Sequence, residues 1–220
     1  MTLPTDHYKL TRRELSLHEL LADGIVHALA LLAGVIAFPL LLFHALQTAN
    51  AGTFVALAVY AAGFFLLWGF SLAHNMTPPS ALKWLLRRFD HSMIYVMIAG
   101  TYTALIPHLE NPAWAWALGL VVWTGAAIGI IVKVVLPGRY DRLSIMAYIL
   151  LGWIGVIAIG PVSAALPEES LWLLAAGGLT YIAGVGFHVW HALQFQNAIW
   201  HSFVAVAAGL HFGAVAVAVA

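Results

Sequence analysis

Residues 113–132 read AWAWALGLVVWTGAAIGIIV, twenty residues without a charged side chain. A helix needs about 20 apolar residues to cross the hydrocarbon core of a bilayer. Asn111 and Pro112 precede this run and Lys133 follows it, as expected of a helix start and of a charged residue at a membrane boundary. The run therefore predicts one transmembrane helix.

Comparable apolar runs follow one another along the whole chain. Of the 220 residues, 63% are hydrophobic and 8% are charged, whereas roughly a quarter of the residues of a soluble domain are charged. We therefore predict an all-α integral membrane protein, a bundle of seven transmembrane helices that forms a single domain of residues 1–220. The predicted spans are about 22–46, 51–74, 90–109, 113–135, 141–161, 169–191 and 197–220.

Charge and cysteine content exclude several classes of function. The formal net charge is zero, which gives no reason to expect nucleic-acid binding, so membrane lipids are the expected partners. The chain has no cysteine, which excludes disulfides and thiolate metal sites.

Positive charge in short loops stays on the cytoplasmic side of a membrane. All nine basic residues fall before the first span, between the second and third, or around the fourth loop, while the opposite loops carry only Glu110, Glu168 and Glu169. This alternation predicts a cytoplasmic N-terminus and an external C-terminus. Residues 8–21 interleave leucines with charged residues, so residues 1–21 are expected to form a cytoplasmic, interfacial segment.

Polar residues gather at the cytoplasmic ends of five predicted spans. They are Asp23 and His27, Ser71 and His74, Asp90 and His91, His188 and His191, and Asn197 and His201. Ionisable groups inside a membrane are costly unless paired or metal-bound, and histidines with a carboxylate are typical zinc ligands. His74, Asp90 and His201 are the strongest candidates by position.

The other members of this group have two readings each. Asp23 and His27 lie one helical turn apart, so they form either a hydrogen-bonded packing pair or part of the site. His91 is either structural or a ligand, and His188 and His191 are either solvated at the interface or ligands. His211 lies roughly 15 Å along the helix from His201 and cannot share its metal.

Small residues recur at helical spacing, as in Gly125-x-x-x-Gly129 and Gly152-x-x-Gly155. In membrane helices this pattern is typical of close helix packing.

Several segments resemble the hemolysin III family, the bacterial branch of the adiponectin and progestin receptor superfamily. The most characteristic stretch is LRRFDHSMIY at 86–95, which runs into IAGTYT at 98–103. The resemblance continues in Glu19 and His27, Gly152-Trp153, Gly177-Gly178-x-x-Tyr181-x-x-Gly184, Ala198-Ile199-Trp200-His201 and His211-Phe212. It covers nearly the whole chain.

This resemblance implies a multi-pass protein of the bacterial inner membrane with one zinc ion near the inner leaflet. It implies that a histidine closing the second span and a His-x-x-x-His pair opening the seventh bind the zinc, while an aspartate and a serine hold its water. Position by position, His74 and His201 are the expected metal ligands, and Asp90 and Ser71 the expected catalytic residues.

Two positions depart from that pattern. Asn197 stands where the first histidine of the pair is expected, and Ser71 lies three rather than four residues before His74, because the expected serine position is Phe70. An amide oxygen is a poorer zinc donor than imidazole. Asn197 could ligate weakly, Asp90 could bind metal directly, His188 or His191 could supply an imidazole, or the zinc could be lost.

Two functions follow from these observations. The first is a zinc-dependent, ceramidase-like hydrolase that cleaves a lipid amide or ester near the cytoplasmic leaflet. The second is a non-catalytic membrane sensor, lipid-binding protein or pore-forming cytolytic protein with a degenerate metal site.

Overall fold

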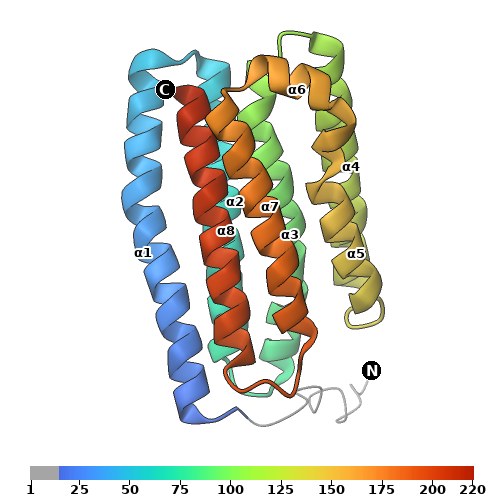
Figure 1. The fold of residues 1–220 in the computed structure, drawn as a ribbon. Helices are drawn as coiled ribbons and strands as arrows, with labels where there is room; N and C mark the ends of the chain where they lie inside the picture. The colour runs from blue at the N-terminus through green and yellow to red at the C-terminus, as the bar shows by residue number, and fades with distance from the viewer. Residues whose placement is uncertain (1–14) are drawn as a thin grey trace.

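The computed structural model describes residues 15–220, and every regular element in this part of the chain is a helix, with no strand (Figure 1). Its elements in chain order are α1 (Leu17–Thr48), α2 (Ala51–Met76), α3 (Ala81–Leu105), η2 (Ile106–His108), α4 (Pro112–Val135), α5 (Asp141–Gly152), η3 (Ile154–Ala158), α6 (Ile159–Ala165), α7 (Glu168–Val189) and α8 (Gln196–Val219). The prediction of an all-α membrane bundle is confirmed.

Short polar residues set where the helices begin. Ser16 caps α1 in a capping box with Glu19, Asn50 accepts a hydrogen bond from the Thr53 amide at the start of α2, and Ser80 caps α3. Such side chains satisfy backbone N–H groups that have no partner inside the helix. The first position of each of these helices is therefore fixed by a local hydrogen bond.

Within residues 15–220, six helical segments are long and apolar enough to cross a membrane, and they correspond to six of the seven predicted spans. The remaining helix, α3, does not meet that criterion, and it begins nine residues before the predicted start at 90. Its first turns carry Lys83, Arg87 and Arg88, which lower its hydropathy. Because α3 packs against both α2 and α4, it is nevertheless part of the bundle.

The fifth predicted span is broken into α5, η3 and α6. At the break, the Tyr102 hydroxyl donates to the Gly152 carbonyl at 2.8 Å and accepts from the Gly155 amide at 2.9 Å. Interrupted helices at membrane depth need such partners for the freed backbone groups. The single continuous span predicted over 141–161 is therefore interrupted, and α3 supplies the compensating side chain.

The long helices run side by side along one direction, α6 lies across one end of the bundle, and the C-terminus lies at the end opposite the start of α1 (Figure 1). The larger core cluster contains buried aromatic residues of α1 and α2, including Phe38, Tyr60 and Trp68, and reaches α8 through Val204 and Val215. A smaller cluster joins α3 to α4 through Tyr95, Val122 and Ala126.

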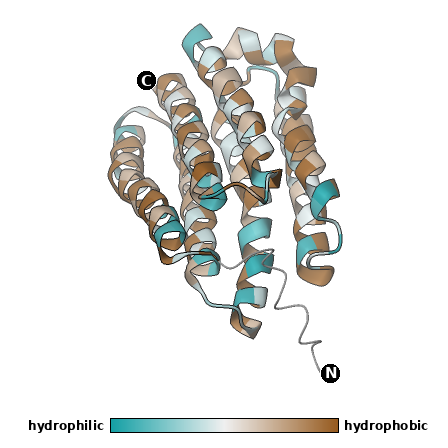
Figure 2. Cartoon of the chain, turned by 60° about the horizontal axis from the view of Figure 1, so that its bottom comes forward, coloured by the Kyte–Doolittle hydropathy of each residue, from teal (hydrophilic) through white to brown (hydrophobic). Residues whose placement is uncertain are grey.

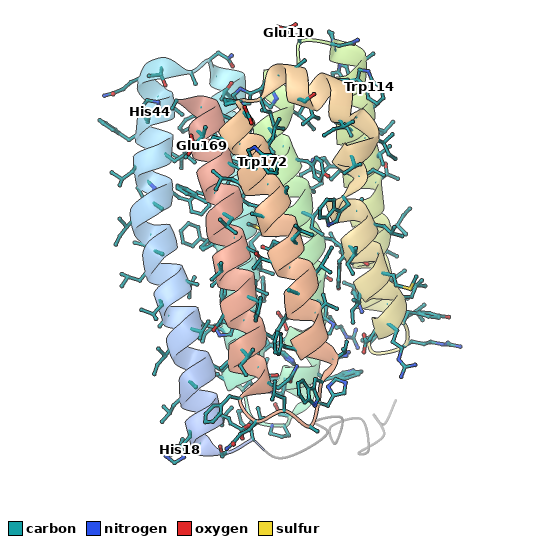
Figure 3. The ribbon with its side chains drawn as sticks, viewed as in Figure 1. His18, His44, Glu110, Trp114, Glu169 and Trp172 are labelled. Atoms are coloured by element: carbon teal, nitrogen blue, oxygen red, sulfur yellow. The ribbon has the colours of Figure 1, made fainter. Side chains whose placement is uncertain are left out.

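Polar residues concentrate at the two ends of the bundle (Figure 2). Glu110, Trp114, Glu169 and Trp172 lie at the end opposite His18 (Figure 3). Tryptophan is enriched at membrane interfaces, so this end fits one membrane surface. The described basic residues lie at the other ends of α3 and α4, in the loop that follows α4, and at the start of α5: Lys83, Arg87, Arg88, Lys133, Arg139 and Arg142.

We expect that basic end to face the cytoplasm, as predicted from sequence. The basic residues Lys9, Arg12 and Arg13 lie outside the described part of the chain. So does most of the predicted interfacial segment, whose last residues, Leu17–Leu21, form the start of α1.

Candidate functional site

The first helix turns three ionisable residues toward the inside of the bundle. Glu19, Asp23 and His27 are spaced four apart, which places them on one helical face, and they are 4%, 2% and 0% exposed. Glu19 completes the capping box with Ser16 and also accepts a hydrogen bond from the Phe195 amide at 3.0 Å. It thereby ties the start of α1 to the start of α8.

Asp23, His27 and His201 meet beside Ser71. One oxygen of Asp23, Oδ1, lies 2.5 Å from Nδ1 of His201 and 3.7 Å from Nδ1 of His27. Nδ1 of His27 donates to the Asp23 backbone carbonyl at 2.8 Å. The Nε2 atoms of His27 and His201 lie 3.1 and 3.5 Å from the Ser71 hydroxyl.

His74 lies near the end of α2 and contacts the first turn of α3. Its Nδ1 donates to the Lys83 backbone carbonyl at 3.2 Å, and its ring lies 6.5 Å from that of His91 between centroids. The Lys83 ammonium in turn donates to the carbonyls of His74 and Thr77 at the end of α2, each at 2.8 Å. This exchange fixes α2 against α3.

Asp90 and His91 point in different directions from α3. Asp90 is buried, and its carboxylate interacts with the side chains of Ser71 and His201. His91 instead lies 4.0 Å from Asp141, which also pairs with Arg87 at 2.6 Å and Lys133 at 2.9 Å. His91 therefore belongs to an ionic cluster that joins α3, α4 and α5.

The remaining candidates have other neighbours. The Asn197 amide lies 3.4 Å from the Asn75 side-chain oxygen. The His188 ring packs on Trp200, with centroids 4.8 Å apart. His211 contacts the Leu174 carbonyl at 3.3 Å and lies roughly 15 Å along α8 from His201.

A cavity of about 1050 Å³ connects these side chains. The site residues predicted from the sequence all line it: Ser71, His74, Asp90 and His201. Its α3 wall runs from Lys83 to Leu105, roughly 33 Å at the rise of an α-helix. The cavity therefore extends from the polar end, along the apolar middle of the bundle, toward its opposite end, where Leu109 and Leu166 line it.

Within the described residues, one group of three side chains has donor atoms close enough to share a metal ion. Asp23, His27 and His201 each offer an atom within 4.8 Å of the others. His74 and Asp90 are outside this group, as are His188 and His191.

Sequence reasoning left Asp23 and His27 open between packing and site membership. The available signal was the spacing of four shared by Glu19, Asp23 and His27, which marks one continuous polar face on an otherwise apolar helix.

The fold and the site define a class of protein: a multi-pass helical membrane protein with a buried His and Asp cluster at one end of an internal cavity. The profile of the Haemolysin-III related family matches residues 15–212, so the chain belongs to this family.

The relatives agree with this assignment. The chain is 38% identical to Hemolysin-3 of Bacillus cereus over 89% of its own length and 90% of the relative's, and 33% identical to the Hemolysin-3 homolog of Bacillus subtilis (strain 168) over 86% and 89%. The human monocyte to macrophage differentiation factor is 30% identical over 57% of this chain and 52% of its own. These matches support a multi-pass bacterial membrane protein related to the adiponectin and progestin receptor superfamily.

Proposed function

We propose that this protein is a zinc-dependent hydrolase that cleaves the amide or ester bond of a membrane lipid. The observation that supports this most is the cavity that joins Ser71, His74, Asp90 and His201 to a long apolar passage. A lipid chain fits an apolar passage, and the bond next to its headgroup would then lie at the polar end.

Two imidazoles of the expected zinc site are present, and the third is missing. Histidines that bind metals usually donate their other ring N–H to a carbonyl or carboxylate. His74 donates its Nδ1–H to the Lys83 carbonyl, and His201 donates its Nδ1–H to Asp23. Nε2 of each ring is therefore the nitrogen that could bind a metal. Zinc, when bound, would polarise the lipid carbonyl and make water a stronger nucleophile. Asn197, bonded to Asn75, does not supply a third imidazole.

The side chains of the chain itself have separate roles in this proposal. Asp90 accepts a proton from the attacking water, whose oxygen bonds to the carbonyl carbon. Asp90 then returns the proton to the leaving amine or alcohol as the C–N or C–O bond breaks. Ser71, which contacts Asp90 and His201, orients the polar groups at the end of the cavity.

The test uses purified protein in lipid nanodiscs with a fluorescent N-acyl sphingoid substrate and a fluorescent phospholipid ester. We expect release of fatty acid that stops on treatment with a zinc chelator and returns with zinc. Asp90→Asn should lower turnover by at least about 100-fold, the scale of a positioned acid or base. His44→Ala, at the other end of α1, is the matched control. Failure to release fatty acid from either substrate would refute hydrolysis of these lipid classes.

The absence of a histidine at 197 favours a second candidate, a membrane protein without catalysis that permeabilises or senses lipid bilayers. The relatives named Hemolysin-3 point the same way. Dye-filled vesicles distinguish the two: leakage that is unchanged in Asp90→Asn supports this second function, and intact vesicles together with fatty-acid release support the first.

A further inference from the structure

The hydrogen bonds around Ser71 leave too few donors for the acceptors that meet there. His27 Nδ1 faces a backbone carbonyl and His201 Nδ1 faces a carboxylate oxygen, so each ring donates from Nδ1. A neutral imidazole that donates from one nitrogen carries a lone pair on the other. Both lone pairs, on Nε2, therefore point to the Ser71 hydroxyl, which has one proton to give.

Two further observations increase this excess of acceptors. The second oxygen of Asp23, Oδ2, is buried and has no hydrogen-bond partner. The Asn75 amide donates to Ser71 Oγ rather than to either histidine. Buried polar atoms without partners are costly, so a cation would satisfy several at once.

We propose that Asp23, His27 and His201 bind a divalent metal ion, with zinc preferred, and that His27 supplies the imidazole that Asn197 cannot. Two histidines with one carboxylate are an established donor set of catalytic zinc sites, which keep a fourth position open. Donors that share a zinc ion at bonds of about 2 Å lie roughly 3 to 4 Å apart. Asp23, His27 and His201 already offer donor atoms within 4.8 Å of one another. Because Asp23 Oδ1 faces the Nδ1–H of His201, one of these two side chains must turn before a carboxylate oxygen and a ring lone pair face the same ion.

This inference rests on the proposed function for the presence of zinc, and it relocates the ion. Its centre is the α1, α2 and α8 interface, and His74 is outside the donor set. The site would sit at the wall of the cavity, because Ser71 and His201 line the cavity while Asp23 and His27 lie behind them.

The alternative is a proton in place of the metal. If His201 carried a second proton, it would donate to Ser71, Ser71 would donate to His27, and the cation would pair with Asp23. That arrangement is a structural hydrogen-bond network, and it requires no metal. Metal analysis separates the two arrangements directly.

The experiment measures metal content of tag-free protein by mass spectrometry, before and after stripping with a chelator and reloading with zinc. The native chain should hold about one zinc per chain. Zinc affinity, measured by competition with a coloured chelator, should fall by more than about 100-fold in His27→Ala and Asp23→Asn, because loss of groups that only orient ligands already lowers affinity 10- to 100-fold. His44→Ala, on the same helix, should keep the native affinity.

His74→Ala provides the decisive comparison. Retained zinc in this variant, with loss in His27→Ala, supports the proposed donor set. Zinc lost in His74→Ala and kept in His27→Ala overturns it, while leaving a zinc hydrolase in place.

Failure of the inference can also be told apart from failure of the proposed function. A native protein that takes up no zinc overturns the inference, whether or not fatty acid is released. Zinc binding through His27 without any fatty-acid release refutes hydrolysis and leaves the metal site standing. Circular dichroism and gel filtration identify a variant that has not folded, and the Asp23→Asn variant, which keeps the side-chain volume, then gives the result.

Discussion

Gly129 of α4 provides a direct test of the helix packing. A methyl group added at this position would overlap three ring atoms of Tyr95 on α3. Tyr95 is buried, and its other neighbour is the ring of Tyr148, 4.5 Å away between centroids. The ring therefore has little room to retreat, and we place Gly129→Ala at the upper end of the cost of overpacking, about 3 kcal/mol.

The higher helix propensity of alanine offsets part of this cost, because alanine stabilises a helix by up to about 1 kcal/mol relative to glycine. Gly209 on α8 gives the matched control, since an added methyl group there meets no atom within 4 Å. Both variants gain the same helix preference, so the difference between their free energies of unfolding, about 3 kcal/mol, isolates the contact with Tyr95. Reversible unfolding in mixed detergent micelles, followed by tryptophan fluorescence, measures it.

A double variant makes the result specific. Tyr95→Ala opens the space that the new methyl group needs, so adding Gly129→Ala to it should cost little or nothing further. Equal stability of Gly129→Ala and Gly209→Ala would refute the close approach of α3 and α4. A full additional loss in the double variant would show that the strain comes from elsewhere.

Three further outcomes are expected. Tyr102→Phe removes two hydrogen bonds at the broken fifth span and should lower the free energy of unfolding by about 1 kcal/mol, since such bonds in membrane proteins average about 0.6 kcal/mol each; an unchanged value would mean that other groups satisfy the break. Asp141→Asn leaves the buried Lys133 ammonium without its carboxylate and should cost about 2 kcal/mol, a loss that shrinks when Lys133→Met is added. Reporters fused after Ala220 should be active only outside the cytoplasm, and cytoplasmic activity would reverse the predicted orientation.

Most of the fold could be predicted from hydrophobic runs because the bilayer fixes the length of each span. The predicted start of the third span was the least accurate boundary. The helix begins nine residues earlier and includes Lys83, Arg87 and Arg88. These side chains are accommodated by local partners: Lys83 caps the end of α2, and Arg87 pairs with Asp141. Such partners come from other helices and are invisible in a hydropathy pattern.

The break in the fifth span was also beyond sequence reasoning. Gly152 and Gly155 were interpreted as small packing residues, and Gly155 does contact the Tyr102 ring closely. The interruption depends on a hydroxyl that arrives from α3, fifty residues earlier in the chain. A single-sequence pattern does not report that pairing.

The depth of the site residues was predictable, whereas their grouping was not. Depth follows from position along a span. This reasoning placed Asp23, Ser71, Asp90 and His201 at one end of the bundle, and the structure has them there. Grouping depends on the rotation of each helix about its own axis. That rotation turns Asp23 and His27 toward His201, and it turns His91 toward Asp141 instead.

The rotation and height of α1 and α8 are set by a contact outside the cluster. The Glu19 carboxylate caps α1 through Ser16 and also binds the Phe195 amide, which fixes the first turns of the two helices at one level. Asp23 follows Glu19 by four residues, about 6 Å of helix rise, and His201 follows Phe195 by six, about 9 Å. The difference of about 3 Å is within the reach of the two side chains, which explains how they meet at 2.5 Å. The capping box at the start of the described chain therefore positions the proposed metal ligands, although it touches none of them.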